Sequence, residues 1–185
     1  DQLGIGDLDG DGMDDVFALR DRDKDGVRVK PYLSTGDGFT RQPGTLLDTE
    51  AYNLLLSSYV AADVDGDGAD ELVAMVHMKR DEGGYGLGMT VTEFSQGSFV
   101  TPQTWREPVT KLDGYTLPTI VATDLDGDGL EDIVSVEGPS EKDSALDLVG
   151  YRSTGEGFEG PVVMAAPTCL RPDCRESSSL VRNVG

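Results

Sequence analysis

Three copies of one acidic loop constrain this chain more than any other feature. They span Asp7–Asp15, Asp63–Glu71 and Asp124–Asp132, and each places carboxylates at loop positions 1, 3, 5 and 9 and glycines at positions 4 and 6. Five acids within nine residues repel one another unless a positive charge lies among them. A hard cation that takes about 6–8 oxygen ligands, Ca²⁺, meets this need, so the repetition predicts about three bound ions.

The spacing within the loop predicts which atoms reach the ion. Side-chain oxygens at positions 1, 3 and 5 converge when the loop curls, and the glycine at position 6 permits the bend. A main-chain carbonyl at position 7 and the carboxylate at position 9 complete the cage. The candidate metal ligands are Asp7, Asp9, Asp11, the Met13 carbonyl and Asp15; Asp63, Asp65, Asp67, the Ala69 carbonyl and Glu71; and Asp124, Asp126, Asp128, the Leu130 carbonyl and Asp132.

The loops match an EF-hand only in their first half. An EF-hand begins in the same way, but it needs a bidentate glutamate at position 12 and flanking helices. Position 12 is Ala18, Ala74 or Ser135 here, which excludes the EF-hand and the related helical dockerin. A metal-free alternative is that the aspartates only cap turns and keep sheet edges soluble. A fourth acidic stretch, Asp21–Gly26, contains two cations, and we expect a solvated turn there.

The loops recur at a regular interval. Their first aspartates, Asp7, Asp63 and Asp124, lie 56 and 61 residues apart. A second element follows in step with them: a Gly-x-Gly-Phe turn that ends at Phe39 and Phe158, with a weaker copy ending at Phe99. A long period of this kind indicates a propeller, a solenoid or an array of repeats.

Each repeat has the pattern of four strands. One apolar run leads into the acidic loop, a second leaves it, and the Gly-x-Gly-Phe turn separates a third from a fourth. The outgoing runs at 16–19, 72–76 and 133–136 are apolar nearly throughout, which predicts strands buried on both faces. Such a unit stacks against like neighbours, as the blades of a β-propeller do. We expect an all-β fold of four-stranded antiparallel propeller blades, with about three repeats at residues 1–50, 51–110 and 111–166, and a cysteine-containing loop and the first strand of a following repeat at 167–185.

The loop and its companion turn resemble a known family. Asp-x-Asp-Gly-Asp-Gly-x-x-Asp before an apolar strand, repeated with a Gly-x-Gly-Phe element, is similar to FG-GAP repeats, and in particular to the VCBS-type FG-GAP-like repeats of bacteria, which are related to integrin α-subunit blades. The resemblance covers residues 4–164 and implies that each loop joins the first two strands of a blade and binds Ca²⁺ through the ligands named above. Two departures matter: Glu71 replaces an aspartate, and the Gly-Ala-Pro element is missing, so integrin-like ligand recognition is not implied.

The ends of the chain favour a piece of a larger ring. The chain begins with Asp1 rather than methionine, and residues 179–185 resemble a run that precedes an acidic loop. Propellers close with about 4–8 blades. We therefore expect an excised or mature part of a longer polypeptide, with further blades supplied by the parent chain or by another copy; an open three-blade array is the alternative.

The net charge and the cysteines limit the environments and partners that we expect for this chain. Asp and Glu total 35 against 15 Lys and Arg, a formal charge of −20, which argues against binding nucleic acid. No apolar run is long enough for membrane insertion. Cys169 and Cys174 are spaced for a local disulfide, with two free thiols as the alternative. A disulfide and weak calcium sites both predict an extracellular protein, secreted or on the cell surface.

Nothing in the sequence nominates a catalytic centre. The lone histidine, His77, lies in an apolar run, where a structural role is expected. The clustered acids are better explained as metal ligands than as glycosidase carboxylates. We expect a non-enzymatic, calcium-stabilised module that acts in binding, adhesion or scaffolding toward a protein or carbohydrate ligand. The alternatives are a non-catalytic accessory domain of an extracellular polysaccharide hydrolase or lyase, and a catalytic metal centre in the loops.

Overall fold

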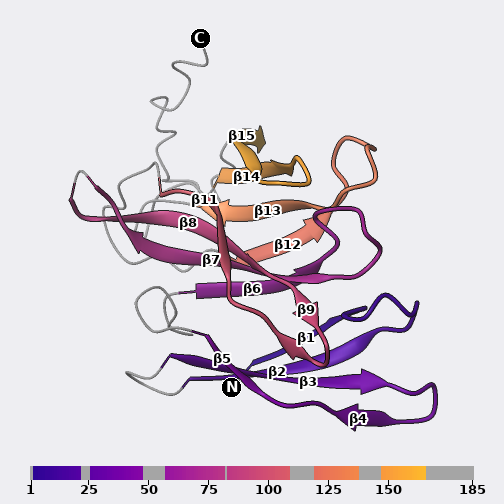
Figure 1. Cartoon of the computed structure of the whole chain (residues 1–185). Coiled ribbons are helices and arrows are strands. Elements are labelled where there is room, and N and C mark those ends of the chain that lie inside the picture. The colour runs from indigo at the N-terminus through magenta and orange to yellow at the C-terminus, as the bar shows by residue number, and fades with distance from the viewer. Residues whose placement is uncertain are drawn as a thin grey trace, which may run out of the picture.

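The computed structural model describes residues 2–21, 26–47, 57–81, 83–108, 119–137 and 147–165. These residues form strands, turns and loops, with no helix among them, and all strands but a two-stranded hairpin build three antiparallel sheets stacked one above another (Figure 1). The all-β prediction is confirmed. Cys169, Cys174 and the strand predicted near the C-terminus lie outside the described residues.

The first sheet contains β1 (Gln2–Gly6), β2 (Asp15–Asp21), β3 (Val27–Ser34) and β4 (Phe39–Arg41) in that order. A further short strand, β5 (Thr45–Leu47), also pairs with β3. Pro43 and Gly44 lie between β4 and β5, and proline lacks the N–H that a ladder requires. The predicted fourth strand is therefore split into two pieces along the same edge of β3.

The other two sheets have the predicted four strands. The second contains β6 (Ser57–Ala62), β7 (Glu71–Lys79), β8 (Tyr85–Thr92) and β11 (Gln103–Arg106), in the order β11-β8-β7-β6. The third contains β12 (Thr119–Thr123), β13 (Asp132–Glu137), β14 (Asp147–Ser153) and β15 (Phe158–Ala165) in sequence order. The described sheets form an open stack rather than a closed ring, and the exact repeat boundaries stay a prediction.

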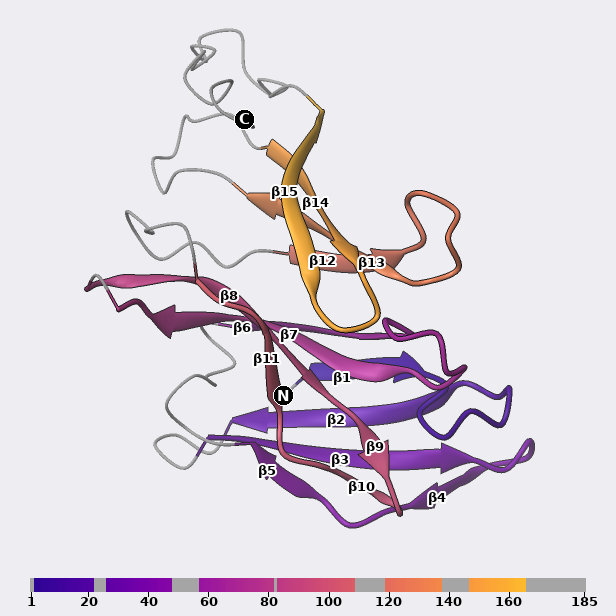
Figure 2. The same cartoon turned by 45° about the horizontal axis from the view of Figure 1, so that its top comes forward.

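The middle Phe element differs from the prediction. Residues 95–99 were expected to turn directly into a fourth strand, but β9 (Phe94–Ser95) and β10 (Ser98–Phe99) form a separate two-stranded hairpin. Its turn residues, Gln96 and Gly97, have φ of 52° and 80°, as a type I′ turn requires. The hairpin reaches down to the first sheet (Figure 2), where the ring centroids of Phe99 and Phe17 lie 6.4 Å apart. The turn is diverted because Phe99 is buried between sheets.

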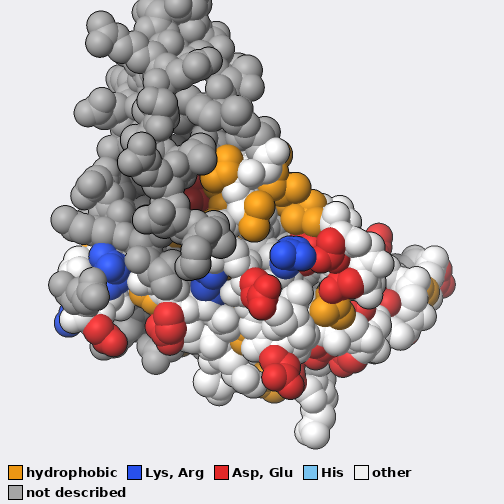
Figure 3. Space-filling model, turned by 90° about the horizontal axis from the view of Figure 1, so that it is seen from above, with side chains coloured by type: hydrophobic (Ala, Val, Ile, Leu, Met, Phe, Trp, Pro, Cys, Tyr) orange, Lys and Arg blue, Asp and Glu red, His pale blue; other side chains and the backbone are white. Residues whose placement is uncertain are grey.

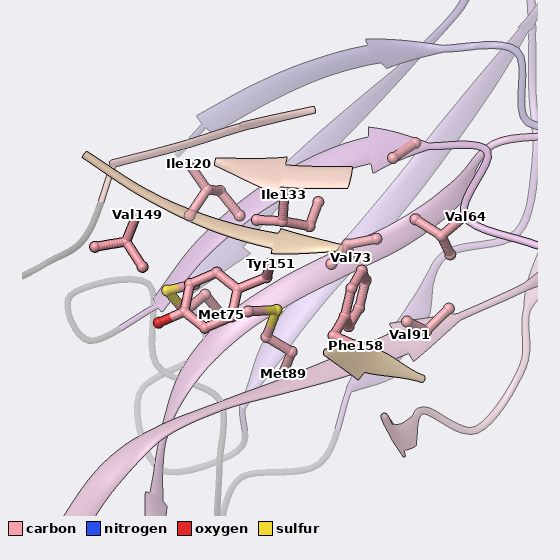
Figure 4. Close-up of a cluster of buried hydrophobic side chains, with 11 residues drawn as sticks. Val64, Val73, Met75, Met89, Val91, Ile120, Ile133, Val149, Tyr151 and Phe158 are labelled. Atoms are coloured by element: carbon pink, nitrogen blue, oxygen red, sulfur yellow. The ribbon is translucent and has the colours of Figure 1, made fainter. Parts of the chain in front are cut away.

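Two apolar layers hold the stack together. Phe17, Leu19 and Val29 of the first sheet pack against Leu72 and Val76 of the second. The opposite face of the second sheet packs on the third through a cluster shown in Figure 4, whose members include Val73, Met75, Met89, Ile133, Val149, Tyr151 and Phe158. The middle sheet is therefore covered on both faces, and the outer sheets are covered on one.

This difference corrects one expectation about the outgoing strands. Strand β7 is buried from Glu71 to His77, as predicted for a strand covered on both faces. In β2, burial alternates: Phe17 and Leu19 are buried, whereas Arg20 is exposed. In β13, Val136 is 40% exposed. The reason is that no described sheet covers the outer faces of the first and third sheets.

Those outer faces keep apolar side chains at the surface. Leu3 and Ile5 are exposed on the first sheet. Seen from the β15 side, Figure 3 shows apolar side chains gathered beside acidic and basic ones. On the third sheet the exposed apolar residues include Val121, Val136, Leu148 and Val162, and the edge strand β15 also exposes Val163, which pairs with the buried Val149, and Met164.

Candidate metal centres

Each acidic loop joins the first two strands of its sheet, and all three loops lie along the same edge of the stack, at the right of Figure 1. Glycines at positions 4 and 6 allow the loops to curl. In the first loop Gly10 and Gly12 have φ of 71° and 86°, and the equivalent glycines of the other loops range from 81° to 93°. Residues with a side chain rarely adopt this conformation, so the glycine spacing seen in the sequence is required by the backbone.

The carboxylate at position 1 organises the bend. Asp7 accepts hydrogen bonds from the N–H groups of Asp11 and Gly12, at 3.1 and 2.7 Å. Asp63 accepts from Gly66 and Gly68 at 2.7 and 3.1 Å. The third loop repeats the second, with Gly127 and Gly129 donating to Asp124 at 2.7 and 3.2 Å. The position-1 side chain therefore points into the curl, where a metal ligand must lie.

The acid at position 9 is the most buried acid of each loop. Asp15, Glu71 and Asp132 are 1%, 3% and 1% exposed. Asp15 accepts from Leu8 N–H at 3.1 Å and from Ser34 N–H of the third strand at 2.7 Å. Asp132 repeats both bonds, accepting from Leu125 and Ser153, and Glu71 repeats the first, accepting from Val64 N–H at 3.2 Å. This acid therefore ties the loop to its own sheet.

Three carboxylates of each loop come together. The groups contain positions 1, 3 and 9, with one oxygen of each within 4.8 Å of the others: Asp7, Asp9 and Asp15; Asp63, Asp65 and Glu71; and Asp124, Asp126 and Asp132. Each cluster could hold a metal ion, consistent with calcium-binding repeats.

The position-5 acids lie outside these groups. Asp11, Asp67 and Asp128 instead accept a hydrogen bond from the N–H of the position-7 residue, each at 2.9 Å. The predicted ligation by the position-5 side chains, and by the carbonyls of Met13, Ala69 and Leu130, stays a prediction.

Burial and mutual repulsion raise the pKa of several carboxyl groups in the loops. Burial raises the pKa of Asp15, and burial together with the charge of Asp11 raises the pKa of Asp9. The largest effect is on Glu71, where burial and the nearby Asp65 and Asp67 raise the pKa to about 8. A divalent cation would reverse this effect because it stabilises the ionised carboxylates.

One arginine contributes positive charge to the third loop. Arg152 Nη1 lies 3.1 Å from Asp126 Oδ2, and the two side chains are 51% and 35% exposed. An exposed pair of this kind contributes about 0–1 kcal/mol. The pair nevertheless occupies an oxygen of a position-3 acid, so it competes with a cation for that ligand.

Sequence reasoning missed the acids at position 8. Asp70 and Glu131 do not point into their own loops; each reaches the main chain of the loop before it, Asp7 and Asp63 respectively. Burial raises the pKa of Asp70. The signal in the sequence is that all three loops carry an acid at this position, including Asp14.

Other candidates identified in the sequence lie away from these groups. His77 is buried in β7, and its structural role stays a prediction. Residues 22–25 of the fourth acidic stretch lie outside the described residues, so the expectation of a solvated turn stays a prediction. In the part of the chain that the structure describes, no helix is long and apolar enough to cross a bilayer.

Comparison with known proteins finds a family model and a solved structure that parts of this chain resemble. Residues 7–74, which contain the first two loops, match the family model of the FG-GAP-like repeat. No curated protein matches the chain. A solved structure, the Tc holotoxin pore of Photorhabdus luminescens, contains a chain that is similar in fold, with a TM-score of 0.55 and 22% identity. The match covers 89% of this chain and 7% of the toxin chain, so it bears on the fold alone.

Proposed function

We propose that this chain is a calcium-stabilised β-propeller segment of an extracellular protein, secreted or on the cell surface. The proposal starts from the match of residues 7–74 to the FG-GAP-like repeat. Its role is binding, adhesion or scaffolding toward a protein or carbohydrate ligand, without catalysis. The observation that carries the proposal is the recurrence of one carboxylate group, at the same three loop positions, along one edge of the stack.

The chemistry of the groups supports calcium over other metals. All the ligands offered are oxygens, and an irregular loop with several carboxylates suits the flexible coordination of Ca²⁺. Mg²⁺ demands near-ideal octahedral geometry and retains its waters, so a curled loop of this kind suits it less well. Thiol and imidazole ligands, which favour zinc and copper, are absent from the three groups.

The proposed role in binding follows from where the metal would act. The acidic loops lie on one edge, and each is tied to its own sheet by a buried acid. Calcium there would stiffen the connection between the first two strands of each sheet and leave other surfaces free for contact. The similarity to a small part of a very large toxin chain supports a module that works inside a larger protein.

Calcium titration of the metal-free protein tests the proposal. Isothermal calorimetry should give about three sites, and thermal unfolding should shift upward with Ca²⁺ and downward with EGTA. A ligand that binds only the folded state at a hundredfold excess over its Kd stabilises it by about 2.7 kcal/mol per site.

A triple variant provides the control. Asp7→Asn, Asp63→Asn and Asp124→Asn together remove the position-1 charges and leave one of the two accepting oxygens in each loop, so the calcium-dependent shift should disappear. The proposal is wrong if wild-type protein gives the same melting curve with Ca²⁺ and with EGTA.

A further inference from the structure

We infer that the acid at loop position 8 is an inter-repeat clamp that couples each metal loop to the loop before it. The inference rests on the proposed calcium function and extends it, because it makes neighbouring sites interdependent. It concerns Asp70 and Glu131, which belong to none of the carboxylate groups that could hold an ion.

The first clamp joins the second loop to the first. Asp70 Oδ2 accepts a hydrogen bond from the N–H of Asp7 at 2.8 Å. In return, the N–H of Asp70 donates to the main-chain carbonyl of Asp7 at 2.6 Å. Both main-chain polar groups of Asp7 are therefore held by one residue that lies 63 positions later in the chain.

The second clamp repeats the first with a longer side chain. Glu131 Oε2 accepts from the N–H of Asp63 at 3.0 Å, and the N–H of Glu131 donates to the carbonyl of Asp63 at 2.8 Å. Each pair of neighbouring repeats is joined by two hydrogen bonds between position 8 of one loop and position 1 of the loop before it. Donor and acceptor are the same in both pairs. The recurrence indicates a built-in feature of the stack rather than an accidental surface contact.

The residue before each position 1 fits the clamp that reaches it. Gly6 precedes Asp7, and a Cβ at Gly6 would overlap the Asp70 carboxylate and the Cβ of Ala61. Ala62, a residue with a Cβ, precedes Asp63, and the acid that reaches this site is the longer Glu131. The shorter Asp70 therefore pairs with a site that has a glycine, Gly6, and the longer Glu131 with a site that has an alanine, Ala62.

The clamped residue is the one that organises a metal loop. The side chain of Asp7 closes the curl of the first loop through Asp11 and Gly12, so fixing its main chain also positions a ligand. The clamping acid, in turn, directly precedes the buried position-9 acid of its own loop, Glu71. Ordering the second loop around a cation therefore orders position 1 of the first, and the third loop acts in the same way on the second.

A second contact reinforces the link to the middle loop. Ser153 Oγ donates to the carbonyl of Val64 at 2.6 Å, while the N–H of Ser153 donates to Asp132 at 2.7 Å. Position 9 of the third loop is thus connected through one serine to position 2 of the second loop. Coupling between these two loops does not depend on Glu131 alone.

The chain supplies a matched control for the test. Asp14 occupies position 8 of the first loop, but it is exposed and no described loop precedes it. Asp14→Ala therefore measures what loss of a position-8 charge does within its own loop. Asp70→Ala removes the same group and also the side-chain hydrogen bond of a clamp, while the main-chain bond to Asp7 can persist. Asp70→Asn removes the charge and keeps an oxygen that can accept from Asp7.

The experiment is a site-resolved calcium titration of the full chain by NMR, with the amides of Gly12, Gly68 and Gly129 as reporters of the three loops. Asp70→Ala should weaken calcium binding at the first loop by about tenfold, since it removes the acceptor of the part-buried Asp7 N–H, and a net hydrogen bond is worth about 0.5–1.5 kcal/mol. Asp70→Asn should restore most of that affinity. Asp14→Ala should leave the second and third loops unchanged.

The outcomes separate this inference from the proposed function. If no glycine reporter of the wild-type protein responds to Ca²⁺, the calcium function is refuted and the coupling falls with it. If calcium binds but Asp70→Ala leaves the first loop at wild-type affinity, only the coupling is refuted. If Asp70→Asn weakens the first loop as much as Asp70→Ala, charge rather than the hydrogen bond is responsible and the clamp is overturned. A weakened first loop that the asparagine restores supports it.

Discussion

The buried Glu71 carboxylate makes the stability of the metal-free protein depend on pH in an unusual direction. Its pKa is about 8 in the folded chain, against an ordinary value of 4.5, because burial opposes ionisation and Asp65 and Asp67 add negative charge. Between these two pH values the folded state binds more protons than the unfolded state. Stability from this group is fully present below about pH 4.5 and is lost as the pH rises through 8.

The size of the effect follows from the shift. A difference of one pKa unit corresponds to about 1.4 kcal/mol, so integrating between pH 5 and pH 8 gives a loss of about 3 kcal/mol from Glu71. Asp15, whose pKa is also raised by burial, changes stability in the same direction. Comparing the wild type with Glu71→Gln isolates the contribution of Glu71, since glutamine is close in shape and does not ionise.

Urea denaturation of the metal-free protein at pH 5, 6, 7 and 8 is the assay. The free energy of unfolding should fall with rising pH in the wild type and should fall by about 3 kcal/mol less in Glu71→Gln. Glu156→Gln, at an exposed turn, is the control and should retain the wild-type slope. Equal slopes for wild type and Glu71→Gln would refute the reasoning. With calcium present, binding should release protons in the wild type.

Two further substitutions test packing and the third loop. Gly4→Ala would place a Cβ against the ring atoms of the buried Phe17, so the free energy of unfolding in urea should fall by about 1–3 kcal/mol. The control Gly38→Ala meets only ordinary contacts and should change this free energy little. Equal losses in the two variants would contradict the packing argument. Arg152→Gln removes the guanidinium that pairs with Asp126, so calcium affinity at the third loop should rise by up to about fivefold in a calorimetric titration. A lower affinity would show that the Arg152–Asp126 pair assists metal binding.

Local spacing was enough to predict the strands and the loops between them. The apolar runs around each acidic loop form the first and second strands of each sheet, and the glycines at positions 4 and 6 adopt the positive φ that the curl requires. These features depend on residues close together in the chain, whose steric and hydrogen-bonding preferences act in the same way in every repeat. The carboxylates at positions 1, 3 and 9 come together for the same reason, and their role as metal ligands stays a prediction.

Contacts between sheets could not be obtained in this way. Phe99 begins no fourth strand because it is buried against Phe17 of another sheet, and β2 is not buried like β7 because no described sheet covers its outer face. The partners of Asp70 and Glu131 lie more than sixty residues away, so local spacing cannot reveal that these acids act on the preceding loop. Short-range geometry thus sets the form of each repeat, and the distance and offset between stacked sheets decide which polar groups meet across them.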